Sequence, residues 1–145
     1  MNRHVAIALS LLLPAVAQAQ QAEKFNAAQL EQDFAPLALF HQNGKVVDKE
    51  VILSRDPDRD SLQAIYVVRA KVEKVLEFYK EKLGVEPKTE GQEELGTLKY
   101  RFTLPLKEGD KRVFKVTVEP TDQRGLVQII VLRRAMTEDD QVVYD

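Results

Sequence analysis

The strongest structural signal in this 145-residue chain is an amphipathic helix that directly follows a short alternating segment. Apolar residues recur at helical spacing on one side of it, and they are Val72, Val75, Leu76, Tyr79 and Leu83. Charged residues fill the opposite side, and Gly84 is the residue expected just past a helix end. The apolar stripe is therefore predicted to belong to a core rather than to a cofactor site.

Segments on both sides of this helix predict the strands that pack against it. Two precede it, at residues 46–53 and 62–68, and three follow it, at residues 98–104, 113–118 and 126–132. Residues 98–104 and 113–118 alternate between apolar and polar, which predicts an antiparallel hairpin with one apolar and one polar face. The sequence thus predicts an α+β fold: a single antiparallel-rich sheet of about five strands with one principal helix, in the order ββαβββ.

Residues 126–132 are apolar on both faces except for Gln128, which predicts a central strand covered on both sides. The helix covers only one of these sides. The N-terminal segment, or Val142, Val143 and Tyr144 near the C-terminus, would have to cover the other. If the second face around Ile130 and Leu132 is uncovered, it predicts a contact surface, and a carrier of a small apolar ligand becomes an alternative function.

The first nineteen residues have the pattern of a cleaved secretory signal peptide. Arg3 supplies the positive charge, residues 5–13 form a small and apolar run, and Ala17-Gln18-Ala19 fits a small-x-small cleavage site. An apolar run of about nine residues is too short for a membrane-spanning helix, which needs roughly 20. We therefore expect a signal peptide at 1–19, an N-terminal lead-in at 20–36 that is a short helix or flexible, an α+β domain at 37–134 and an acidic tail at 135–145.

Composition limits where the mature chain works and what it binds. Without residues 1–19 it has 20 Lys and Arg against 23 Asp and Glu, a net charge of −3, which argues against a nucleic-acid or anionic-membrane binder. The chain has no cysteine, so it carries neither an N-terminal lipid nor a disulfide. We expect a soluble periplasmic protein, a monomer or a homodimer, that does not span the membrane after cleavage.

Few side chains suited to catalysis remain in the mature chain. It has one histidine, His41, and two serines, Ser54 and Ser61, and neither serine lies in a nucleophile motif. Asp56, Asp58 and Asp60 have the spacing that begins a calcium loop, but Ser61 and Val67 stand where that loop needs glycine and glutamate. The sequence thus predicts a solvated turn here, and no catalytic residue, metal or cofactor is expected.

One candidate binding surface follows from the predicted hairpin. Five residues would share its polar face, namely Lys99, Arg101, Thr103, Lys115 and Thr117. This basic, hydroxyl-bearing strip is suited to an anionic glycan, a lipid head group or a partner protein through charge-assisted hydrogen bonds. The alternative is an ordinary solvated sheet face.

The helix at residues 72–84 supports two resemblances. Its V-x-x-F-Y-x-x-x-L pattern, from Val75 to Leu83, is similar to that of small exported bacterial α+β domains without assigned function. More weakly, it resembles the helix of one βαβββ module of the glyoxalase (vicinal oxygen chelate) superfamily. That resemblance implies a divalent metal held by His and Glu on the sheet, but the usual first His position falls near Ala64, and a single module would need a partner copy.

These observations together predict an exported, non-enzymatic binding or accessory protein whose partner is an envelope protein or a small ligand. Two alternatives stay open. One is a metal-dependent enzyme or metal-binding protein of glyoxalase-like fold, and the other is the carrier of a small apolar ligand.

Overall fold

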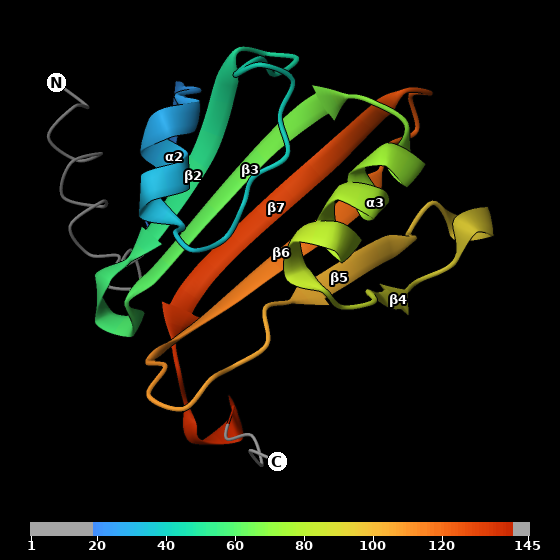
Figure 1. The fold of residues 1–145 in the computed structure, drawn as a ribbon. Coiled ribbons are helices and arrows are strands. Elements are labelled where there is room, and N and C mark those ends of the chain that lie inside the picture. Colours follow the sequence, from blue (N-terminus) through green and yellow to red (C-terminus); the bar gives the residue numbers. More distant parts are fainter. Residues whose placement is uncertain (1–18, 141–145) are drawn as a thin grey trace, which may run out of the picture.

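A computed structural model describes residues 19–140 as one seven-stranded sheet with two α-helices on one of its faces (Figure 1). The elements are β1 (Ala19–Lys24), α2 (Ala27–Asp33), β2 (Glu50–Asp56), β3 (Ser61–Arg69), α3 (Val72–Leu83), β4 (Lys88–Glu90), β5 (Lys99–Thr103), β6 (Arg112–Pro120) and β7 (Leu126–Ala135). The strands lie in the order β1-β2-β3-β7-β6-β5-β4, and every neighbouring pair is antiparallel.

The structure confirms the α+β class and the single antiparallel sheet, but the predicted strand count and element order are wrong. Seven strands replace about five, and α2 joins the principal helix α3, so the order is βαββαββββ. The two additional strands, β1 and β4, form the two edges of the sheet, and most of their side chains are exposed. Edge strands pair on one side only and need no apolar alternation, so the sequence carried no periodic signal for them.

Helix α3 follows the predicted stripe closely. Val75, Tyr79 and Leu83 are its buried residues, one turn apart on the side that faces the sheet. The helix ends at Gly84, which adopts the left-handed conformation with φ 68° and donates its N–H to the carbonyl of Lys80. The predicted helix at residues 72–84 is therefore present, and Gly84 ends it in the left-handed conformation that is common for a glycine at this position.

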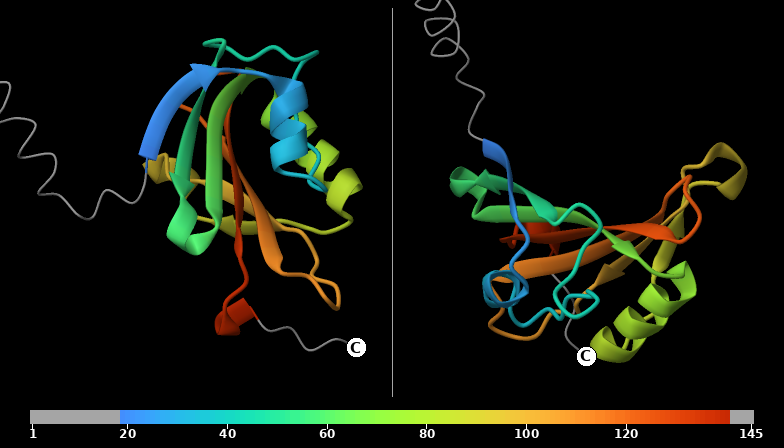
Figure 2. Two further views of the ribbon diagram at one scale, coloured as in Figure 1. Left: turned by 90° about the vertical axis from the view of Figure 1, so that its left-hand side faces the viewer. Right: turned by 90° about the horizontal axis from the view of Figure 1, so that it is seen from above.

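Helix α2 belongs to the lead-in that the sequence left as a short helix or a flexible segment. It begins because the side chain of Asn26 accepts a hydrogen bond from the backbone N–H of Gln29 at 3.1 Å, a common N-cap. Its Leu30, and Phe34 just after it, are buried. Figure 2 shows α2 and α3 on the same face of the sheet, so this segment adds to the cover that α3 provides.

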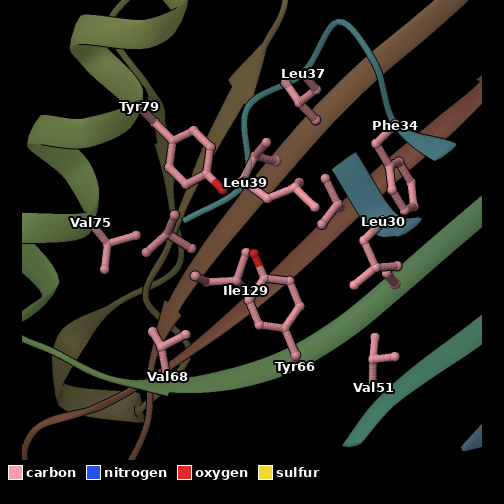
Figure 3. Packing of buried hydrophobic residues seen from close by; sticks show 14 of the residues in the cluster. Leu30, Phe34, Leu37, Leu39, Val51, Tyr66, Val68, Val75, Tyr79 and Ile129 are labelled. Atoms are coloured by element: carbon pink, nitrogen blue, oxygen red, sulfur yellow. The ribbon is translucent and has the colours of Figure 1, made fainter. Parts of the chain in front are cut away.

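The chain between α2 and β2 crosses the space between the two helices, and two buried tyrosines hold it there. The hydroxyl of Tyr66, on β3, donates to the carbonyl oxygen of Phe40 at 2.8 Å. The backbone N–H of Phe40 donates to the hydroxyl oxygen of Tyr79, on α3, at 2.9 Å. Figure 3 shows both hydroxyls directed toward this segment, whose Leu37 and Leu39 are buried in the same cluster.

Removing one tyrosine hydroxyl should destabilise the protein measurably. Tyr79→Phe leaves the partly buried N–H of Phe40 without its partner, so we expect a loss of about 1–3 kcal/mol in the free energy of unfolding. Urea denaturation followed by circular dichroism measures this loss. Tyr100→Phe is the matched control, because that half-buried tyrosine has no hydroxyl hydrogen bond among the described residues and should lose under about 0.5 kcal/mol. Equal losses in both variants would contradict the proposed role of Tyr79.

The same tyrosines predict a loss of stability at high pH. Burial raises the pKa of Tyr79 to about 12 and raises the pKa of Tyr66 well above its ordinary value. An unfolded chain releases these protons near pH ~10, so their contribution to stability is complete below that pH and is lost as the pH rises toward the folded-state values. Tyrosinate absorbance and circular dichroism, recorded together, should show that these two residues ionise only as the sheet unfolds. Their ionisation in a still-folded protein would contradict this expectation.

Candidate functional site: the open face of the sheet

The face of the sheet opposite the two helices, here called the open face, carries one continuous row of side chains across all seven strands. The pairing register places side by side Ala22, Ile52, Ile65, Ile130, Thr117, Arg101 and Lys88, one from each strand in spatial order. The row is aliphatic on β2, β3 and β7 and polar on β6, β5 and β4. The open face is thus divided into an apolar half and a polar half.

The apolar half is only partly shielded. Ile52 is 39% exposed, and Ile65, Ile130 and Leu132 are half-buried, whereas Ile129 on the helix face is fully buried. Strand β7 is central, as predicted, and among the described residues the second cover that its apolar pattern predicted is incomplete. In the N-terminal lead-in, β1 extends the edge of the sheet and α2 lies on the same face as α3, so residues 20–36 do not cover the open face. Val142, Val143 and Tyr144 lie outside the described residues.

The polar half contains the predicted binding residues. Arg101 on β5 pairs with Thr117 on β6, and Thr103 pairs with Lys115, so these four side chains lie on one face. Lys99 follows on the same side of β5 by strand alternation. The structure therefore brings together the whole predicted strip, with Thr103 exposed and the other four residues half-buried.

Two carboxylates that sequence reasoning did not include moderate the charge of this strip. Glu90, on the unpredicted strand β4, lies 3.1 Å from a guanidinium nitrogen of Arg101. Glu119 on β6 accepts a hydrogen bond from the side-chain amide of Gln128 at 3.0 Å. Among residues 19–140, Lys99 and Lys115 have no ion pair within hydrogen-bonding range, so they are the positive charges of the strip most accessible to a ligand.

The C-terminal end of β7 is fixed at one end of the open face. The two terminal guanidinium nitrogens of Arg134 donate to the two carboxylate oxygens of Asp140, at 2.6 and 2.9 Å. This bidentate pair, together with the backbone N–H of Thr137, holds the pKa of Asp140 well below its ordinary value. The start of the predicted acidic tail is therefore folded: Ala135 completes β7, and the N–H of Met136 donates to the carbonyl of Lys111.

The other side chains that could take part in catalysis or metal binding form local hydrogen bonds and ion pairs. The Nδ1 atom of His41 accepts the N–H of Gly44 at 2.9 Å, and its Nε2 atom lies 2.8 Å from a carboxylate oxygen of Glu31. Asp60 forms a bidentate pair with Arg112, which lowers the pKa of that carboxyl, instead of converging with Asp56 and Asp58. Within residues 19–140, no three His, Cys, Asp or Glu side chains come together as a metal site.

Two surface hollows in the described part of the chain lie away from the open-face isoleucines. One, of about 430 Å³, is lined by Pro36, Asp60, Leu104, Pro105, Leu106, Asp110, Lys111, Arg112 and Phe114. Another, of about 810 Å³, lies beside the first turn of α3 and the turn before β7. Both mix charges of both signs, and neither contains His41 or a serine. In the described part of the chain, no helix is long and apolar enough to cross a membrane.

Comparison with family models, curated proteins and solved structures found no match to this chain. The two resemblances of the helix at residues 72–84 therefore still rest on its sequence alone. The function has to be argued from the geometry of the open face.

The exposure of the open face can be checked with two adjacent isoleucines on β7. Ile129→Ala removes a fully buried side chain, and we expect a loss of about 2–5 kcal/mol in the free energy of unfolding. Ile130→Ala removes the half-buried neighbour on the open face and should cost about 1 kcal/mol, because less apolar surface is lost from the interior. Urea denaturation compares the two variants. Equal losses would mean that the open face is packed as tightly as the helix face.

Proposed function

We propose that this protein is exported to the periplasm and acts there as a non-enzymatic binding or accessory protein, with the open face as its contact surface. The observation that carries this proposal is the row in which Ile52, Ile65 and Ile130 continue directly into Thr117, Arg101 and Lys88. A partner with an apolar segment beside an acidic one would match both halves. The sequence of residues 1–19 supports the location.

The layout of the open face favours a macromolecular partner. Protein interfaces combine an apolar centre with a polar rim that remains accessible to solvent. Here the aliphatic residues of β2, β3 and β7 form such a centre, Lys115 and Lys99 lie on one side, and Arg134 lies at one end. Acidic groups of a partner would bind the lysines through charge-assisted hydrogen bonds, while its apolar residues cover the isoleucines.

The alternatives have less support in the structure. A carrier of a small apolar ligand usually encloses most of the ligand surface in a concave pocket, whereas Ile52, Ile65 and Ile130 lie on the outer surface of a sheet. A glyoxalase-like metal protein would need His and carboxylate ligands on its sheet, and Ala64 occupies the expected position in β3. The basic, half-apolar open face is the feature that a binding protein explains best.

Photo-crosslinking in the periplasm tests this proposal. A photoreactive amino acid at Thr117, on the open face, should give one discrete adduct, and the same group at Glu77, exposed on α3, should give none. Reversing the charge at Lys115 and Lys99 should reduce the adduct at Thr117 about tenfold or more, because each charge-assisted hydrogen bond contributes roughly 1.5–3 kcal/mol. Mass spectrometry identifies the partner.

The other outcomes are also decisive. Equal adducts at Thr117 and Glu77 would reject the open face as the contact surface. An adduct with a second copy of the chain would assign this face to a homodimer instead of a separate partner. Recovery of the protein only from the cytoplasmic fraction would reject the periplasmic location.

A further inference from the structure

The apolar side chains of the open face form a narrow stripe along the two central strands. Ile65 and Ile130 are directly opposite each other on β3 and β7, and Val67 and Leu132 extend the stripe in opposite directions along these strands. All four are half-buried. From a rise of about 3.3 Å per residue and a strand spacing of about 4.8 Å, the stripe is about 14 Å long and runs at roughly 20° to the strands.

The backbone beneath this stripe is already fully engaged in the sheet. Strand β3 lies between β2 and β7, and β7 lies between β3 and β6, so neither strand has a free edge to which a partner strand could add. The stripe therefore offers a partner only side-chain contacts. A partner segment that covers it has to pair its own backbone N–H and C=O groups internally, because each unpaired group is costly once it is buried.

A single α-helix meets this condition and has the right width. Two strands spaced about 4.8 Å apart occupy roughly 10 Å, and a helix with its side chains is about 10–12 Å across. A second sheet would extend over β6, where Lys115 and Thr117 interrupt the apolar surface. The protein already packs one helix against the opposite face in this way, through Val75, Tyr79 and Leu83 of α3, which lie one turn apart.

The two strands that flank the stripe differ in charge. Lys115 on β6 is directly opposite Leu132, and among residues 19–140 it is not ion-paired. Glu119 lies on the same face of β6 at the other end of the stripe, where it accepts a hydrogen bond from Gln128. Strand β2 carries Glu50 on this face. Acidic residues of a partner are therefore attracted to the end of the stripe between Leu132 and Lys115.

We infer that the partner covers this stripe with an amphipathic α-helix, which lies along β3 and β7 and places an acidic residue over Lys115. This inference rests on the proposed contact function of the open face. The stripe corresponds to between two and three helical turns of about 5.4 Å each, so the helix needs apolar residues at i, i+3 or i+4, and i+7. It would add a third layer to a sheet whose own helices all lie on one face (Figure 2).

Cross-linking from the stripe itself tests this inference. A photoreactive amino acid is placed, one position at a time, at Ile65, Val67, Ile130 and Leu132 of the protein in its own periplasm. Peptide mass spectrometry then locates the partner residue that each position joins. We expect all four to join one partner segment of about 8–12 residues, at positions three, four or seven apart and in the order of the probes along the stripe.

Two controls keep the result interpretable. Each variant must retain the wild-type circular dichroism spectrum, and where one does not, the probe moves to Gln63 or Gln128, which lie on the same strands and the same face. The same group at Glu77, exposed on α3, should give no adduct.

A charge reversal tests the acidic residue of the helix. Lys115→Glu should reduce the adduct at Leu132 about tenfold or more, because a charge-assisted hydrogen bond is replaced by repulsion. Lys74→Glu is the matched control, since it makes the same change at an exposed position on α3 and should leave the adduct unchanged. Equal effects of the two reversals would contradict the acidic contact at Lys115.

The failures of the helix and of the proposed function are distinguishable. Adducts two residues apart in one partner segment would indicate an extended strand, and adducts scattered over several segments would indicate a broad globular surface. Either result would overturn the helix and leave the open face as the contact surface, as would an adduct at Thr117 with none from the stripe. Adducts to a second copy of the chain, or within one chain, would overturn the separate helical partner. Equal adducts at Thr117 and Glu77 would reject the contact surface and the helix together.

Discussion

The pair of hydrogen bonds at the Phe40 backbone is the interaction on which the rest of the structure depends: the hydroxyl of Tyr66 donates to the Phe40 carbonyl oxygen, and the Phe40 N–H donates to the hydroxyl of Tyr79. It joins three parts of the chain that are remote in sequence: β3, α3 and the segment after α2. Both tyrosines are nearly fully buried, so neither hydroxyl has water as an alternative partner. The segment is thereby fixed between the helices, and both helices and their connection lie on one side of the sheet.

Because both helices lie on one face of the sheet, the opposite face keeps partly exposed apolar side chains. Because α2, α3 and the intervening segment all pack on the helix face, Ile65 and Ile130 are left half-buried on β3 and β7 at the centre of the sheet. Neighbouring charged residues limit how far this apolar area extends, since Lys115 lies opposite Leu132 on the adjacent strand. The apolar area on this face is therefore bordered by charge, and it is the surface on which the proposed partner would bind.

The sequence predicted the elements in which buried apolar residues recur at regular spacing. It missed those that are held mainly by backbone hydrogen bonds and bury few side chains. Helix α3 and the pair β5–β6 carry clear apolar patterns, and the polar strip around Arg101 and Lys115 followed from the alternation of that pair. Strands β1 and β4 bury little and have no such pattern, and α2 depends on the local cap at Asn26. Missing β4 also meant missing Glu90, which offsets part of the positive charge beside Arg101.

The reactive side chains of the described residues take part in local hydrogen bonds and ion pairs, and this is one reason why a contact function is proposed. His41 uses one ring nitrogen on the Gly44 turn and the other toward Glu31, Asp60 is paired with Arg112, and the buried tyrosines hold main chain. Each of these groups therefore has partners within the described part of the fold. Lys99 and Lys115 differ from them, because among residues 19–140 neither is ion-paired. A ligand on the open face would therefore gain their charge without disturbing the fold beneath it.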